Sequence, residues 1–214
     1  CDRASDGSIL PERLIEGHGM RLADFVAHPH AAIARLSDAE VAALRLYTTA
    51  CYKSLNQPLR SSLTAAAGDS SSHPLPVTMA LIKEGVDKLR AVDAASGLTA
   101  NTEVVLYRGL KSVTVDSEFL TRGGTEVAPM STTPDLATAL YYARSSNAVI
   151  LRLHTRSSLE RGADVSFLSA FPREHEVLFP PLTYLQPHKA NKSVPLKLRV
   201  GDASFDVVDV EPRR

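Results

Sequence analysis

The sequence predicts an α+β protein in which helices come first and strands follow. Amphipathic helical patterns occupy the stretch between Ser37 and Pro58 and the stretch 77–93. After Gly97, apolar segments with the composition of strands dominate, and only one short helical pattern interrupts them. No internal repeat occurs at a fixed period, so repeat architectures are not indicated.

Length and composition are those of an ordinary globular chain. The 214 residues suit one well-cored domain with a modest N-terminal extension, which we place at 1–36 before a domain at 37–214. The 24 basic and 24 acidic residues give no net charge, so no nucleic-acid partner is indicated. No apolar run approaches the roughly 20 residues that span a bilayer, so no membrane span is expected. Cys1 and Cys51 leave open both their pairing and the redox compartment.

The extension is expected to contain at most short helices, and the first clear helix follows it. Ser37 to Glu40 fits a capping box, with Leu36 and Val41 placed as a hydrophobic staple. An apolar stripe then runs through Val41, Leu44, Tyr47, Cys51 and Leu55. Pro58 is expected to end this helix.

A Ser-rich segment with Gly and Pro at 61–76 predicts a loop. A second amphipathic helix is expected over 77–93, with one apolar face made by Ile82, Val86, Leu89 and Val92.

The second half of the chain is expected to be mainly strands. The predicted strands cover 104–107, 126–130, 149–153, 177–179, 182–185, 194–200 and 205–210. A short helix is expected between two of them, with Thr133 as its N-cap, Pro134 at the first helical position and Asp135 to Ala143 following.

Three short segments at or beside these strands carry chemistry. They are Tyr107-Arg108-Gly109, Ser131-Thr132-Thr133 and Glu174-His175-Glu176. Arg108 offers a planar fork of donors that matches a phosphate, and Gly109 would let a ligand approach the backbone closely. Ser131 lies too early to cap the following helix, so its hydroxyl is available to a ligand or a neighbouring side chain. Each segment alone also fits a structural role, such as a surface ion pair or an edge serine.

The two glutamates are the sharpest of these signals. In an extended segment, residues two apart point to the same face, so Glu174 and Glu176 would share one site while His175 turns away. Two close carboxylates repel, which raises one pKa and leaves one group suited to proton transfer. A solvated charged turn is the alternative.

The order and spacing of these segments resemble the arginine–serine–glutamate signature of mono-ADP-ribosyltransferases, in their bacterial toxin-like branch. The resemblance covers roughly residues 37–210 and implies an ADP-ribosyltransferase-like fold, with N-terminal helices packed on a two-sheet β core. Tyr52 and Asn56 match a helix tyrosine and asparagine that approach NAD in that family. Tyr141, Tyr142 and Arg144 resemble the aromatic and arginine residues that contact nicotinamide and phosphate.

The resemblance implies a division of labour on NAD as substrate. Arg108, with Gly109 beside it, would hold the phosphate and nearby ribose, and Ser131 would position Glu176. Glu176 would stabilise the cation that forms as nicotinamide leaves. Glu174 would activate the acceptor, and a glutamate there implies an exposed arginine of a protein. Phe171 would contact that acceptor or simply pack.

Other functions remain possible or are excluded by the residues. An NAD glycohydrolase would use water as acceptor, and a catalytically inactive NAD-binding module belongs to a different class. A serine hydrolase would need a Gly-x-Ser-x-Gly elbow, which is absent. His28 and His30 lack other ligands at metal-binding spacing, so no metal is expected. A secreted or host-delivered effector and an intracellular domain of a larger protein both fit the sequence.

Overall fold

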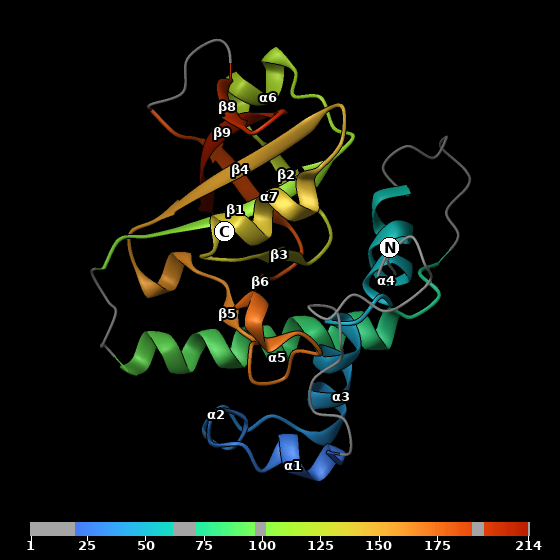
Figure 1. The fold of residues 1–214 in the computed structure, drawn as a ribbon. Coiled ribbons are helices and arrows are strands. Elements are labelled where there is room, and N and C mark those ends of the chain that lie inside the picture. The colour runs from blue at the N-terminus through green and yellow to red at the C-terminus, as the bar shows by residue number, and fades with distance from the viewer. Residues whose placement is uncertain (1–19, 62–71, 97–101, 190–194, 214) are drawn as a thin grey trace.

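The computed structural model describes residues 20–61, 72–96, 102–189 and 195–213. Within these ranges, an N-terminal group of helices packs beneath a β region, with α5 running between them (Figure 1). The helices of the N-terminal group are α1 (Leu22–Val26), α2 (Pro29–Ile33), α3 (Asp38–Tyr47), α4 (Tyr52–Ser61) and α5 (Pro76–Ser96).

The predicted capping box is confirmed at the start of α3. The Ser37 hydroxyl accepts a hydrogen bond from the Glu40 backbone N–H, and the Glu40 carboxylate accepts one from the Ser37 N–H at 2.7 Å. The single long helix expected there is instead two helices. The hydroxyls of Thr48 and Thr49 bond back to carbonyls three residues earlier, which competes with the helical ladder and accompanies the break.

The prediction that Pro58 ends a helix is wrong. Pro58 lies inside α4, which begins only at Tyr52 and continues to Ser61. Most of the predicted loop at 61–76 falls on residues 62–71, outside the described residues.

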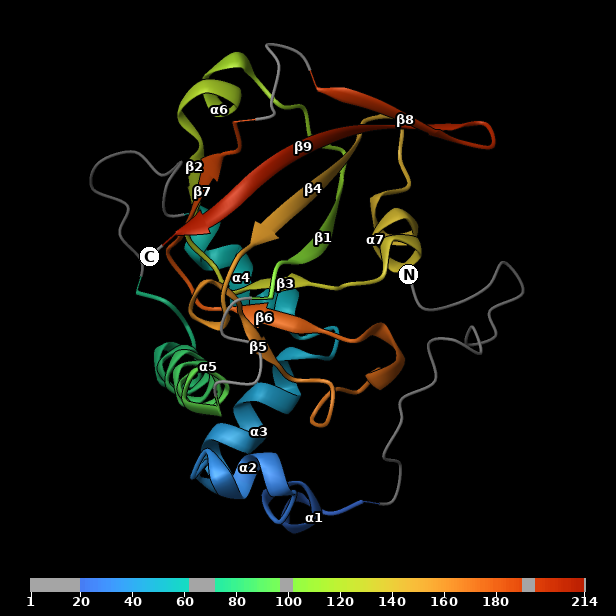
Figure 2. The same cartoon turned by 90° about the vertical axis from the view of Figure 1, so that its left-hand side faces the viewer.

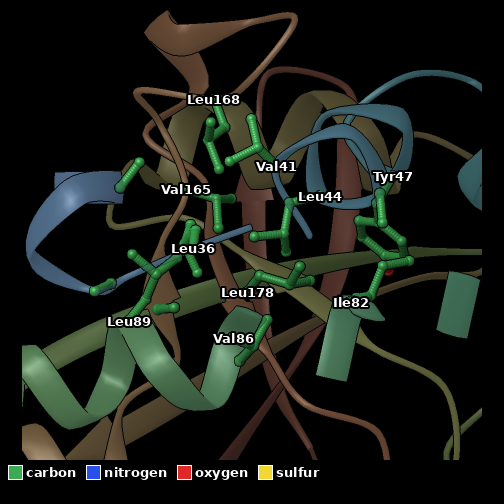
Figure 3. Packing of buried hydrophobic residues seen from close by; sticks show 14 of the residues in the cluster. Leu36, Val41, Leu44, Tyr47, Ile82, Val86, Leu89, Val165, Leu168 and Leu178 are labelled. Carbon is green, nitrogen blue, oxygen red and sulfur yellow. The ribbon is translucent and has the colours of Figure 1, made fainter. Parts of the chain in front are cut away.

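The helical layer has one apolar core, drawn in Figure 3. As predicted, Ile82, Val86 and Leu89 of α5 are buried, and they pack with Leu44 of α3. The helices approach so closely that a Cβ on Gly85 would lie 2.8 Å from the Leu44 Cδ1. Residues of the small sheet described below, such as Leu178, also join this core.

The predicted extension contributes to this same core. Phe25 of α1 and Ala31 of α2 are buried in it, and the Arg45 guanidinium lies 4.1 Å from the centre of the Phe25 ring. The boundary at 36/37 stays a prediction, and residues 1–19, Cys1 among them, lie outside the described residues.

The β region is made of two sheets, as the resemblance implied. The larger sheet has the order β1-β4-β9-β7-β2. The strand β8 also belongs to it and pairs with the first half of β9, whereas β7 pairs with the last residues of β9. Its strands are β1 (Val104–Lys111), β2 (Gly124–Glu126), β4 (Ala148–Thr155), β7 (Thr183–Pro187), β8 (Leu196–Val200) and β9 (Ala203–Arg213). Only β4 and β9 are parallel among these described pairs. Val194, predicted to begin a strand, lies outside the described residues.

The smaller sheet has the order β3-β6-β5 and lies between the larger sheet and the helical layer (Figures 1 and 2). Its strands are β3 (Met130–Thr132), β5 (Ala163–Asp164) and β6 (Val177–Phe179). A second apolar core joins the sheets, since Met130 and Phe179 pack with Leu106, Leu151 and other residues of the larger sheet. Four further helical segments of the described residues connect strands: α6 (Ser117–Arg122), α7 (Leu136–Ala143) and the 3₁₀ turns η2 (Ser158–Glu160) and η3 (Pro172–Glu174).

Two local predictions in the β region need correction. The strand predicted at 126–130 is the end of β2 and the start of β3, with a connection between them. The N-cap of α7 is Asp135 rather than Thr133, because the Asp135 carboxylate accepts hydrogen bonds from the N–H groups of Ala137 and Thr138. Pro134 therefore precedes the cap.

No helix in the described part of the chain would cross a bilayer, since even the 21-residue α5 carries charged side chains along its length.

Candidate active site

The candidate site lies where the two sheets meet. An isolated bridge joins β1 to the end of β3: the Tyr107 N–H donates to the Thr133 carbonyl at 2.7 Å, and the Thr133 N–H donates to the Tyr107 carbonyl at 2.9 Å. This bridge places Arg108, the next residue of β1, beside β3. The Arg108 guanidinium then donates to the Ser131 carbonyl at 2.8 Å. Arg108 and Ser131, predicted from separate segments, are thus brought together.

Arg108 belongs to a group of charges that the sequence analysis did not assign to the site. Its Nη2 lies 3.6 Å from the Glu126 Oε2, and the Arg60 guanidinium holds the same carboxylate with two hydrogen bonds, at 3.2 and 2.9 Å. Burial lowers the pKa of Arg108, and the charge of Glu126 opposes this effect. The result is two guanidinium groups fixed around one carboxylate.

Apolar space adjoins these charges. A cavity of about 400 Å³ is lined by Arg60, Arg108 and Glu126 and by apolar side chains that include Phe119 and Met130. It combines a large apolar wall with cationic groups at one side, which suits a ligand that carries both an aromatic ring and phosphates.

Gly109 has a structural explanation that differs from the predicted one. A Cβ at this position would lie 2.0 Å from the Ala139 carbonyl oxygen and 2.9 Å from the Ala143 nitrogen. The missing side chain therefore allows α7 to pack on β1. Close approach of a ligand is not needed to explain this glycine, and a cofactor contact through its backbone stays a prediction.

Ser131 and Glu176 face one another across the β3–β6 pair. Ser131 pairs with Leu178, two residues beyond Glu176, and its hydroxyl hydrogen-bonds the Glu176 carboxylate. Glu176 is only 8% exposed. Burial raises the pKa of Glu176 to about 7; the charge of Glu174 adds to this rise, while the hydrogen bond from Ser131 and the charge of Arg108 oppose it.

The expectation of an extended Glu174-His175-Glu176 segment is wrong. Glu174 ends the 3₁₀ turn η3 (Pro172–Glu174), and His175 adopts the left-handed conformation with φ 49° and ψ 52°. Backbone bonds hold this turn, including one from the Glu174 N–H to the Phe171 carbonyl at 3.0 Å. The turn gives the two glutamates different surroundings, because Glu176 is buried and Glu174 is only half-buried. Their charges nevertheless act on one another.

Glu174 is held from two directions. The Thr133 hydroxyl donates to its backbone carbonyl at 2.7 Å. The Tyr142 hydroxyl of α7 donates to its Oε1 at 2.7 Å. Thr133, predicted only as a helix cap, thus contacts the segment that carries the candidate acceptor glutamate.

The helix α4 brings Tyr52 and Asn56 towards this region. Asn56 is buried, and its amide nitrogen donates to the Tyr47 hydroxyl at 3.0 Å, which itself donates to the Pro129 carbonyl at 2.7 Å. The Asn56 Oδ1 is buried without a hydrogen-bond partner among the described residues. Tyr52 is exposed, with its ring centre 6.4 Å from that of Tyr47.

Arg60 and Glu126 are the residues that sequence reasoning missed. Arg60 follows Tyr52 and Asn56 at successive spacings of four, so all three lie along one helix face. That spacing could have identified Arg60. The position of Glu126, 66 residues further along the chain, has no comparable local signal.

The remaining predicted residues lie around this centre with less defined contacts. Tyr141 is 45% exposed and packs edge-to-face on Tyr142, and Arg144 is exposed at the end of α7. Phe171 is 8% exposed, which favours packing over contact with an acceptor. His28 stacks on Phe167, with ring centres 4.5 Å apart. Among the described residues, no group of three or more His, Cys, Asp or Glu side chains could hold a metal.

The arrangement of helices on two sheets, with the site at their junction, is the fold of ADP-ribosyltransferases. HopU1 of Pseudomonas syringae pv. tomato DC3000 aligns with a TM-score of 0.59 at 18% identity, over 96% of this chain and 90% of that one. Plx2a of Paenibacillus larvae aligns with a TM-score of 0.60 at 16% identity, over 90% and 95%. The Vis toxin of Vibrio splendidus, solved in complex with agmatine, aligns with a TM-score of 0.58 at 18% identity, over 90% and 83%.

The sequence itself identifies the family. A family model described as ADP-ribosyltransferase exoenzyme matches residues 27–194. The chain belongs to the ADP-ribosyltransferase exoenzyme family, and its reaction is NAD-dependent ADP-ribosylation. No curated protein sequence matches the chain significantly. The predicted family and fold class are confirmed, while the arginine–serine–glutamate signature stays a prediction.

Proposed function

We propose that this enzyme transfers a single ADP-ribose from NAD to an arginine of a protein acceptor and releases nicotinamide. The observation that carries this proposal is the unequal pair of glutamates. Glu176 is buried, with its pKa raised to about 7 beside Ser131 and Arg108, while Glu174 is half-buried at the rim. Two carboxylates in different surroundings suit two different tasks.

In the proposed complex, the cationic groups hold the pyrophosphate of NAD. Arg108 supplies the donor fork, and Arg60 lies beside it on the same carboxylate. Asn56 would approach the substrate from α4, next to the Tyr47 hydroxyl. Tyr52, Tyr141, Tyr142 and Arg144 would border the substrate from α4 and α7, and Gly109 would contact it through its backbone.

The chemical step assigns one role to each glutamate. The bond between the ribose C1 and the nicotinamide nitrogen breaks, and its electron pair leaves with nicotinamide. Ionised Glu176 stabilises the cation on the ribose, which is electrostatic stabilisation at the place where charge develops. A guanidinium nitrogen of the acceptor then bonds to C1, and Glu174 accepts the proton that this nitrogen loses.

The acceptor assignment rests on the chemistry of Glu174. A carboxylate matches a guanidinium in both charge and geometry, and the pair forms two parallel hydrogen bonds. The structure of the Vis toxin with agmatine, a small guanidinium compound, supports this acceptor class for the fold. Phe171 would contribute at most its small exposed edge to the acceptor surface.

The test is incubation with labelled NAD and agmatine, measuring nicotinamide release and ADP-ribosylated agmatine separately. Glu176→Gln is expected to abolish nicotinamide release, because the ionised carboxylate is lost. Glu174→Gln is expected to lose transfer to agmatine and to retain some NAD hydrolysis. Glu118→Gln, on the exposed ion pair with Arg122 in α6, is the matched control and should behave as wild type.

The same assay separates the alternatives. Free ADP-ribose without modified agmatine would identify an NAD glycohydrolase. The absence of any nicotinamide release would indicate an inactive NAD-binding module. Full activity of Glu176→Gln would remove Glu176 from the mechanism.

The description of the family as exoenzymes favours a secreted or host-delivered protein over an intracellular domain.

A further inference from the structure

The hydrogen bond between Tyr142 and Glu174 joins two parts of the site that are far apart in sequence. Tyr142 lies on α7, and Glu174 lies 32 residues later at the end of η3. Its donor–acceptor distance of 2.7 Å is that of a well-formed O–H···O hydrogen bond. The bond lies at the rim of the site, where an acceptor would arrive.

Both partners of this bond are otherwise held in place. The Glu174 backbone is fixed by its own turn, through the bond from its N–H to Phe171 and the bond from the Thr133 hydroxyl to its carbonyl. The Tyr142 ring packs edge-to-face on Tyr141, with ring centres 5.6 Å apart. With its backbone fixed, a glutamate side chain still has three rotatable bonds, and the phenol selects among their conformers.

We infer that the Tyr142 hydroxyl is a positioning group for Glu174, and that it determines how efficiently ADP-ribose passes to a guanidinium acceptor instead of water. This inference rests on the proposed function. A carboxylate oriented before the acceptor binds loses less conformational entropy when it captures a guanidinium. Water needs no such oriented partner, so hydrolysis of NAD depends less on the hydroxyl than transfer does.

The hydroxyl and the ring of Tyr142 have separable roles. The ring is among the groups expected to border NAD, and Tyr142→Phe keeps the ring while removing only the donor to Glu174. The effect of that variant should therefore be larger on transfer to the acceptor than on cleavage of NAD. A structural defect of α7 would affect both.

The experiment compares the full-length wild-type chain with its Tyr142→Phe variant. Each protein is assayed with NAD alone and with NAD plus agmatine. We expect kcat/KM for agmatine to fall roughly tenfold, the size expected for one hydrogen bond to a charged group. The rate of nicotinamide release in water should fall by less, so that the ratio of transfer to hydrolysis decreases. Tyr184→Phe is the matched control, because it removes another exposed phenol hydroxyl, which donates to the Arg122 carbonyl and not to Glu174.

Each outcome is decisive. An unchanged kcat/KM for agmatine in Tyr142→Phe overturns the inference, and so does an equal fall in transfer and hydrolysis. If wild type itself fails to modify agmatine while cleaving NAD, the proposed arginine acceptor is refuted and this inference is refuted with it. Wild-type transfer with an unaffected variant refutes the inference alone.

Discussion

At the scale of single residues, the proposed mechanism makes Glu176 the group that determines how activity depends on pH. Its pKa is raised to about 7, mainly by burial, and its neighbours Glu174 and Arg108 act in opposite directions. Because the ionised form stabilises the ribose cation, kcat/KM for NAD cleavage should rise with pH, reach half its maximum near pH 7 and then level off. Steady-state kinetics between pH 5 and 9 measure this. A flat profile over that range would contradict the assignment.

The same raised pKa makes the contribution of Glu176 to the free energy of unfolding depend on pH, in a direction that can be predicted. Because its pKa in the folded state lies above the ordinary 4.5, protonated Glu176 stabilises the fold at pH values below about 4.5. That contribution is lost as pH rises through about 7. At about 1.4 kcal/mol per pKa unit, the loss amounts to about 3 kcal/mol. Glu176→Gln should therefore unfold at higher denaturant concentration than wild type at pH 8, and the difference should disappear near pH 4.

The sequence could predict single site residues but not their surroundings. Arg108, Ser131, Glu174 and Glu176 were predicted to share one site, and the structure brings them together. The Glu174 segment was expected to be extended because the alternation of two carboxylates suggests a strand. The left-handed His175 depends on the turn that η3 makes, which the residue types alone do not indicate.

At the scale of elements, the packing of α7 on β1 controls the position of Tyr142. Gly109→Ala would place a Cβ 2.0 Å from a backbone oxygen of α7, and rotation of a side chain cannot relieve that contact. We expect a loss of about 1–3 kcal/mol in the free energy of unfolding, together with reduced transfer activity. Gly124→Ala is the control, since its Cβ meets only the Phe119 side chain, at 3.2 Å. Urea unfolding compares the two variants, and equal effects would count against the close packing of α7.

Element boundaries were predicted well where the signal is local and wrongly where tertiary contacts decide. The capping box at Ser37 involves residues within one turn, and the structure reproduces it. Thr133 and Asp135 are both good N-cap residues, and the local pattern does not choose between them. The bridge to Tyr107 takes Thr133 out of the helix, so the cap passes to Asp135.

At the scale of the whole molecule, the N-terminal helices are part of the catalytic domain's core. Phe25 of α1 is 6% exposed, although it belongs to the predicted extension. Phe25→Ala should cost about 3–5 kcal/mol in the free energy of unfolding, the usual range for truncation of a buried phenylalanine. Leu22→Ala, on the same helix at an exposed position, should cost far less. Denaturant unfolding of both variants tests this, and a small effect at Phe25 would favour a separate extension.

The fold class followed from the order of helices and strands, but the sheet arrangement did not. The parallel pair of β4 and β9 joins segments more than 50 residues apart, and the division into two sheets depends on such long-range pairs. The alternation of apolar residues identifies strands without naming their partners. The two-sheet core was expected only because the segments resembled those of a known family.

The bridge between Tyr107 and Thr133 has a consequence for how this enzyme stops working. Arg108 belongs to one sheet, while Ser131 and Glu176 belong to the other, so the reactive groups are divided along a seam. If the sheets separated slightly, each would keep its internal ladder, but the guanidinium would no longer face the carboxylate. Such a separation would open the second core, which spans both sheets, but it would leave the helical core intact. We therefore expect the working lifetime of the enzyme to depend on how firmly the second core and the Tyr107–Thr133 bridge hold the sheets together.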